Sequence, residues 1–152
     1  MASESDIRWM RQALVLAERA EAAGEVPIGA LLVDVEGQVL GEGFNRVLTD
    51  ADPTAHAEII ALRQAAEREN NYRLPDTTLY VTLEPCSMCA GALVNARVKR
   101  VVYAADDLRA GAHHSVFEVL TSPVLNHRCE VTGGILAEDS AEMLRHFFRS
   151  RR

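Results

Sequence analysis

The sequence is poor in aromatic residues, which make up 5%, has only three cysteines, and lacks a long apolar stretch. No run reaches the roughly 18 apolar residues that a membrane helix needs, so we expect no membrane span. Three cysteines in 152 residues cannot supply a disulfide framework, and Cys86 and Cys89 are only three positions apart. We therefore expect a reduced, cytoplasmic protein whose close cysteine pair carries out chemistry or binds metal.

Targeting and linker signals are missing too. Residues Met1 to Trp9 carry acids and have no apolar centre, so we expect no secretory signal. No repeat, low-complexity tract or Pro/Ser linker divides the sequence, and we expect one domain over residues 1–152. Hydrophobic residues make up 48% and charged residues 25%, which is typical of a globular protein. These features exclude a disordered chain, a collagen-like fibre and a disulfide-built miniprotein.

The charge is unevenly distributed. The net charge of −6 argues against non-specific binding to polyanions. The last eight residues nevertheless contain four arginines and no acid, namely Arg145, Arg149, Arg151 and Arg152. Taken alone, this basic end is either a patch that contacts RNA or a solvated helix terminus.

Hydrophobic spacing predicts alternating helices and strands. We expect helices over Asp6–Ala23, Ala55–Glu69, Ser87–Ala96 and Asp139–Arg149. We expect strands over Ile28–Val33, Gln38–Phe44, Leu79–Leu83, Arg100–Ala104 and Glu130–Thr132, the first two forming a hairpin whose first strand is buried on both faces. Residues 105–115 are expected to form a loop, with a further helix before the last strand. The order predicts an α/β fold: a three-layer sandwich with a mixed central sheet of about five strands and helices on both faces.

Two short segments carry the candidate chemistry, His56-Ala57-Glu58 and Pro85-Cys86-Ser87-Met88-Cys89. Cys86 and Cys89 share one face if they lie in the first turn of a helix, where the helix dipole favours thiolates. Two thiolates and a histidine leave one position of a tetrahedral zinc ion open, as in catalytic zinc sites. A helix of about 14 residues and a returning strand would bring His56 back beside Cys86.

Glu58 is the candidate base. Two thiolates neutralise Zn²⁺, so such a centre acidifies its water less than an all-histidine site does, and a nearby base is needed. A carboxylate that takes a proton from zinc-bound water can return it to a ring nitrogen and then to a departing amine. Hydrolytic deamination of an amino-substituted heterocycle requires this sequence of transfers.

His-x-Glu followed by Pro-Cys-x-x-Cys resembles the signature of the zinc-dependent nucleobase deaminases. The likeness extends to the bacterial tRNA-specific adenosine deaminases and covers nearly the whole chain. It is carried by Glu25 to Ala30, Gly43 to Arg46, Asp52 to Glu58, Leu79 to Cys86, Asn126 to Arg128 and Phe147 to Arg149. This resemblance implies a cytidine-deaminase-like fold and conversion of the wobble adenosine of an arginine tRNA to inosine by a homodimer with one zinc ion per subunit.

The same resemblance implies substrate-binding roles. Asn45 would hydrogen-bond the flipped base or its sugar, Ile28 would line the pocket, and Asp107 would contact the nucleotide. Phe148 and the terminal arginines, Arg149 among them, would hold the anticodon stem-loop by stacking and phosphate contact. The sequence departs from the family at His113 and His114, where small residues are usual.

Other interpretations of the same residues stay open. The cysteine pair could be a redox pair, or Cys129 could complete a structural zinc site, although we expect Cys129 to be a buried, inert thiol. We expect Met88 in the core, one of Phe147 and Phe148 in the core, and His113 and His114 exposed. At the level of function, the alternatives are a deaminase of a free base or nucleoside, such as guanine or cytosine, and a zinc-stabilised RNA-binding module without catalysis.

Overall fold

The computed structural model describes residues 3–151, and the expectations for Met1 and Arg152 lie outside the described residues. The helices are α1 (Glu4–Ala22), α2 (Ala57–Glu69), α3 (Ser87–Asn95) and α4 (Ala137–Ser150). The strands are β1 (Gly29–Val33), β2 (Val39–Phe44), β3 (Thr78–Leu83), β4 (Arg100–Ala105) and β5 (Glu130–Thr132). None of the helices in residues 3–151 is both long and apolar enough to cross a membrane.

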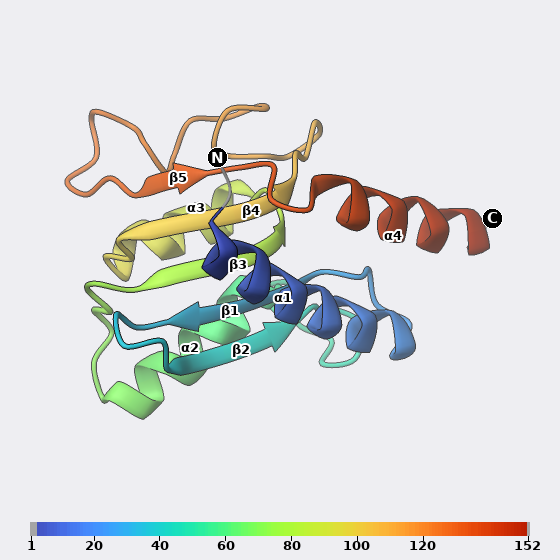
Figure 1. Ribbon diagram of the computed structural model, residues 1–152, viewed down its shortest axis with the longest axis horizontal. Coiled ribbons are helices and arrows are strands. Elements are labelled where there is room, and N and C mark those ends of the chain that lie inside the picture. The colour runs from blue at the N-terminus through green and yellow to red at the C-terminus, as the bar shows by residue number, and fades with distance from the viewer. Residues whose placement is uncertain (1–2, 152) are drawn as a thin grey trace.

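The five strands form one mixed sheet in the order β2-β1-β3-β4-β5 (Figure 1). β1 pairs antiparallel with β2 and β3, whereas β4 is parallel to β3 and to β5. The hairpin and the following strand–helix units therefore meet at β1 and β3. The expectation of a mixed five-stranded sheet is confirmed.

Helices cover both faces of the sheet (Figure 1). α2 and α3 pack on one face, and α1 and α4 on the other. Successive residues of β1 alternate between the two cores: Leu32 packs beneath α2 and α3, while Leu31 packs beneath α1. All five residues of β1 are buried, as expected for a strand covered on both faces.

Close contact between α2 and β2 fixes where α2 begins. A Cβ atom at Gly41 would overlap the carbonyl oxygen of Ala61 and lie 2.9 Å from the backbone nitrogen of Ala65. Only glycine lets the helix approach the strand this closely. At Gly43, a Cβ atom would lie 2.6 Å from the carbonyl oxygen of Ala57, so the first turn of α2, next to His56, is also held against β2.

A buried ion pair joins α1 to β4. The Asp6 carboxylate, 3% exposed, accepts two hydrogen bonds of 2.8 Å from Arg100 and one of 2.9 Å from the Tyr80 hydroxyl. The Arg100 guanidinium holds the pKa of the Asp6 carboxyl below its ordinary value of 3.8. The pair lies on the face of the sheet that α1 covers, opposite α2 and α3, and joins α1 to β3 and β4.

The expected helix between β4 and β5 is wrong, because the described residues 106–129 form turns and loops. The backbone N–H groups of His113, His114 and Ser115 donate to the side chain of Glu84 instead of to carbonyls four residues earlier. Pro123 adds a position without an N–H donor. The other elements lie within two residues of their expected bounds, with α1 and α4 each beginning two residues earlier than expected, at Glu4 and Ala137.

Candidate metal centre and active site

Two helix starts bring the candidate metal ligands together. His56 is the N-cap residue of α2 and Cys86 is the N-cap residue of α3, each with extended backbone angles. Cys89 follows in the first turn of α3, so its side chain and that of Cys86 lie on the same side. The expectation that both segments lie at helix starts agrees with this geometry, and α2 begins two residues later than expected because His56 caps it.

The three ligand atoms form a triangle of the size that zinc requires. His56 Nδ1 lies 3.6 Å from Cys86 Sγ and 3.4 Å from Cys89 Sγ. Around a tetrahedral zinc ion with ordinary bond lengths, a sulfur and a nitrogen ligand are about 3.6 Å apart. All three atoms lie within 4.8 Å of one another. These residues therefore fit zinc in both donor type and spacing.

The two thiols of the triangle have pKa values shifted in opposite directions. Hydrogen bonds from Cys89 and His56 lower the pKa of Cys86 to about 4, although burial opposes the shift. The pKa of Cys89 is raised, because its thiol donates to Cys86 and is buried. A divalent ion between the two sulfurs would stabilise both in the charged form.

Glu58 lines a cavity of about 160 Å³ together with His56 and Cys86 of the metal triangle. Its carboxyl is 4% exposed, and burial raises its pKa to about 7. A carboxyl with this pKa can both accept and return a proton near neutral pH. It lies in the first turn of α2, two residues after His56, and is not one of the three clustered ligands.

The structure brings the expected base-binding residues to the same cavity. Ile28 and Asn45 line one side, and Asp107 and Ala110 line another. Asn45 donates its backbone N–H to the Ile28 carbonyl at 3.1 Å, which ties the two residues together. The side-chain oxygen of Asn45 accepts from the Val47 N–H at 3.4 Å.

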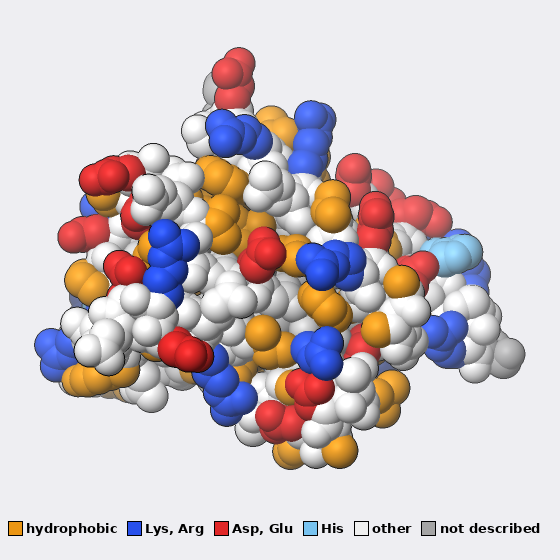
Figure 2. Space-filling model, turned by 90° about the horizontal axis from the view of Figure 1, so that it is seen from below, with side chains coloured by type: hydrophobic (Ala, Val, Ile, Leu, Met, Phe, Trp, Pro, Cys, Tyr) orange, Lys and Arg blue, Asp and Glu red, His pale blue; other side chains and the backbone are white. Residues whose placement is uncertain are grey.

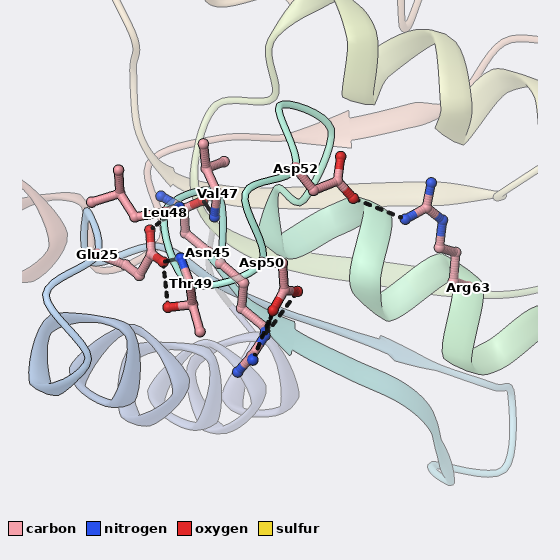
Figure 3. A network of polar contacts seen from close by, with 9 residues as sticks. Glu25, Asn45, Val47, Leu48, Thr49, Asp50, Asp52 and Arg63 are labelled. Carbon is pink, nitrogen blue, oxygen red and sulfur yellow. Dashed lines mark hydrogen bonds and ion pairs between the residues drawn. The ribbon is translucent and has the colours of Figure 1, made fainter.

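Glu25 holds a loop beside the cavity, a role that sequence reasoning missed. Its buried carboxylate accepts the N–H groups of Leu48 and Thr49, at 3.1 and 2.6 Å, and the Thr49 hydroxyl (Figure 3). These bonds hold the loop that follows Asn45. The sequence offered one signal for this role: Glu25 is an acidic residue a few positions before the apolar stretch that forms the buried strand β1.

Glu84 is the second residue that was missed. Its carboxylate accepts backbone N–H groups from Asp107, His113, His114 and Ser115 and the Ser115 hydroxyl. Burial favours the neutral form, but these hydrogen bonds dominate and lower its pKa to about 2. Glu84 thus holds the loop on the other side of the cavity.

A wider groove of about 850 Å³ continues from the cavity toward α4. The two hollows share Ile28, Leu83 and Asp107, and the groove is also lined by Arg109, Phe148 and Arg151. Phe148 is 53% exposed whereas Phe147 is 6% exposed, so the expectation that one of them is core is confirmed.

The arginines of α4 are only partly available to a ligand. Arg149 does not line the groove and donates to Glu142 at 3.3 Å, and Arg145 pairs with Glu138 and Glu142. On the face viewed from below, basic and acidic side chains are interspersed (Figure 2). The negative net charge is therefore not gathered into one patch on that face.

His113, His114 and Cys129 lie outside the metal triangle and differ in burial. His114 is exposed as expected, but His113 is half-buried, because its ring packs edge-on against Tyr103 with centroids 5.9 Å apart. The expectation of an exposed His113 is wrong. Cys129 is buried in the core under α2 and α3, where burial raises its pKa to about 11, and it is not part of the metal triangle. Met88 is half-buried and lies outside the core.

Comparisons with known proteins identify deaminases as relatives of this chain. A family model described as MafB19-like deaminase matches residues 4–152. The tRNA-specific adenosine deaminase of Haemophilus influenzae is 53% identical over 150 residues, which are 99% of this chain and 87% of the relative.

Solved structures show the same fold. One, from a study of A-to-I editing by tRNA:A34 deaminases at the wobble position of transfer RNA, has a TM-score of 0.86 and 44% identity, covering 90% of this chain and 99% of that chain. A guanine deaminase from Nitrosomonas europaea has a TM-score of 0.78 and 27% identity, and the match covers 97% of this chain and 85% of that chain. Because 99% of this chain aligns with the Haemophilus influenzae enzyme at 53% identity, the chain belongs to the family of tRNA-specific adenosine deaminases.

Proposed function

We propose that this protein hydrolyses the wobble adenosine of an arginine tRNA anticodon to inosine, with release of ammonia. The observation that carries the proposal is the triangle of His56, Cys86 and Cys89, two of which line one small cavity together with the buried Glu58. The family relationship supports adenosine in tRNA as the substrate. The arginine tRNA rests on the resemblance of the sequence motifs.

His56, Cys86 and Cys89 are the proposed zinc ligands. When bound there, zinc supplies a Lewis acid that makes water a better nucleophile at neutral pH. Glu58 accepts one proton of the attacking water and delivers it to the ring nitrogen next to the reacting carbon. It then accepts the second proton, from the hydroxyl group now on that carbon, and delivers it to the amine, which leaves as ammonia as the C–N bond breaks and the carbonyl forms. Its pKa of about 7 suits both directions of transfer.

The cavity walls supply the proposed base recognition. Asn45 hydrogen-bonds the flipped base or its sugar, Ile28 packs against the base, and Asp107 contacts the nucleotide. A cavity of about 160 Å³ admits a single flipped nucleobase and excludes a duplex. Phe148 offers an exposed ring for stacking in the adjoining groove, and Arg109 and Arg151 line that groove and offer cations for phosphates. Arg149 lies outside the groove and would have to exchange its bond to Glu142 for a phosphate.

A homodimer in the cytoplasm is part of the proposal. The homodimer rests on family resemblance, and light scattering on the zinc-loaded protein tests it directly. The cytoplasm is proposed because zinc-binding thiols must stay reduced, and all three cysteines are free.

The activity test compares an arginine-tRNA anticodon stem-loop that carries the wobble adenosine with free adenosine, guanine and cytosine. We expect inosine in the stem-loop and no product from the free compounds. The guanine deaminase of the same fold makes free guanine the most informative competitor. Turnover of a free base without turnover of the stem-loop would move the function to nucleotide salvage, and zinc binding without any turnover would favour an RNA-binding module.

A further inference from the structure

We propose that Glu84 is a positioning residue for the substrate. Its buried carboxylate sets the backbone of residues 106–115, named here the Glu84 loop, and thereby holds Asp107 against the base pocket. The inference rests on the proposed function for its substrate. The contacts that carry it do not depend on that function.

The first argument is the convergence of donors on one side chain. Glu84 Oε1 accepts the Asp107 N–H at 3.1 Å, and Oε2 accepts those of His113, His114 and Ser115 at 3.0, 3.1 and 3.2 Å. The Ser115 hydroxyl also donates to Oε1. Glu84 is 2% exposed, so water does not replace these bonds easily. Both ends of the Glu84 loop are thus tied to a single carboxylate.

The second argument is the close fit of the loop around this carboxylate. A Cβ atom at Gly111 would overlap the Glu84 carboxyl group. The Ala112 N–H donates to the Pro85 carbonyl at 2.8 Å, which brings the loop beside the strand end that leads to Cys86. The loop therefore wraps the carboxylate from several sides.

The third argument is the position of Asp107. Its side chain accepts the N–H groups of Arg109 and Ala110 at 3.1 and 3.2 Å, while its own N–H is held by Glu84. Asp107 and Ala110 line the base cavity, and Asp107, Leu108 and Arg109 line the groove. Release of the Asp107 N–H would loosen the part of the loop that faces substrate.

A second metal ion is the competing role for this carboxylate, because oxygens of Glu84 and Asp106 and a nitrogen of His114 lie within 4.8 Å of one another. A carboxylate has about four lone-pair positions. Five hydrogen bonds already occupy those of Glu84, and Asp106 is bonded to His114 at 3.0 Å. The donor set therefore favours loop organisation over metal binding.

The Glu84→Gln variant distinguishes between the hydrogen bonds at the two ends of the Glu84 loop. Three N–H groups converge on Oε2, so the amide oxygen must take that position and the amide NH₂ must take the position of Oε1. There, the Ser115 hydroxyl can accept from the NH₂, but the Asp107 N–H faces another donor. The variant therefore loses the bond to Asp107 selectively and keeps those to residues 113–115.

The experiment uses the zinc-loaded full chain and three readouts: zinc content, site-resolved amide hydrogen exchange, and kcat and KM with the stem-loop. For Glu84→Gln we expect full zinc content and at least tenfold faster exchange at the Asp107 amide, with residues 113–115 little changed. We expect KM to rise about tenfold and kcat to stay within about threefold, the effect of one lost charge-assisted hydrogen bond. Asp6→Asn is the matched control, because it removes a buried carboxylate far from the cavity and should change neither Asp107 exchange nor KM.

Unchanged exchange at Asp107 together with unchanged KM in Glu84→Gln would overturn the proposal, as would an equal change of both in Asp6→Asn. If Glu84→Gln loses zinc or does not fold, Ser115→Ala decides: a smaller rise in Asp107 exchange and KM supports the proposal, and no change in either overturns it. If the wild-type chain does not deaminate the stem-loop, the proposed function fails, while the exchange measurement still tests the role of Glu84.

Discussion

On the metal side of the cavity, the functional side chains project from the first turns of α2 and α3, whereas on the substrate side they project from loops. The metal side consists of His56, Glu58, Cys86 and Cys89. The substrate side consists of residues 45–49 and the Glu84 loop, which carry Asn45 and Asp107. Helices hold the first group through their own regular hydrogen bonds. The loops have no such ladder, and a buried carboxylate, Glu25 or Glu84, accepts their N–H groups in its place.

The difference shows two ways of obtaining a rigid site. A helix start aligns side chains by local geometry, so the chemistry depends on nearby residues in the sequence. A loop held by a distant carboxylate can change its length and side chains while its anchor stays in place. His113 and His114 illustrate this, because their backbone N–H groups bind Glu84 whatever their side chains are. We infer that the residues on the metal side determine which reaction is catalysed, and that the loops on the substrate side determine which substrate binds in the cavity.

The largest effect is expected on the metal side. Glu58→Gln should keep zinc and fold but lower kcat by about 10²–10⁴-fold, because the amide cannot transfer the proton. Single-turnover assays with the stem-loop, together with zinc analysis, measure this. Near wild-type turnover would remove Glu58 from the proposed mechanism.

Gly111→Ala tests the substrate side without altering a charge. The new methyl group would overlap the Glu84 carboxyl, and relief of such overlap costs about 1–3 kcal/mol of stability. Thermal unfolding and KM are the measurements, with KM rising and zinc content unchanged. Gly91→Ala is the matched control, since a Cβ there meets no atom within 4 Å. Equal KM values for the two variants would contradict a close fit around Glu84.

Asp6→Asn tests a buried carboxylate that belongs to neither the metal side nor the substrate side of the cavity. Loss of its bonds to Arg100 should reduce the free energy of unfolding by about 2 kcal/mol at pH 7. The pKa of Asp6 is lower in the folded state, so its stabilisation is present above the ordinary value of 3.8 and is lost as the pH falls below it. Urea unfolding of wild type and variant between pH 7 and pH 3 should give a difference that narrows below about pH 4. A constant difference would mean that the charge of Asp6 contributes nothing.

The smallest effect is expected in the groove. Phe148→Ala should weaken stem-loop binding about tenfold, because stacking of a base on an aromatic ring stabilises by roughly 1–3 kcal/mol. Stability should change little, since the ring is 53% exposed. Val35→Ala, at an exposed position of the β1–β2 turn, is the control for fluorescence-anisotropy binding assays. Equal binding by both variants would exclude Phe148 from RNA contact.

Regular elements could be predicted because local spacing determines them. The apolar run that forms β1, the helix formers of α2 and the proline before Cys86 each act within a few residues, and their expected bounds agree closely with the structure. The metal triangle could be predicted for a related reason: the lengths of α2 and β3 together return the chain to its starting edge. The helix expected between β4 and β5 failed because a residue more than twenty positions earlier, Glu84, takes the N–H groups of that segment.

The sequence by itself indicated a mixed sheet, the helices and strands other than the helix expected between β4 and β5, and the candidate ligands of the metal centre, since each depends on periodicity or on short motifs. Only the tertiary structure decided that Glu25 and Glu84 are buried loop anchors, that Phe148 rather than Phe147 faces the groove, and that Arg149 pairs with Glu142. These outcomes depend on contacts between residues far apart in the chain or on how α4 packs against the sheet. A glutamate in a sequence gives no indication of whether its carboxylate will be hydrated or will accept hydrogen bonds from four backbone N–H groups. The fold determines which of these partners surrounds it.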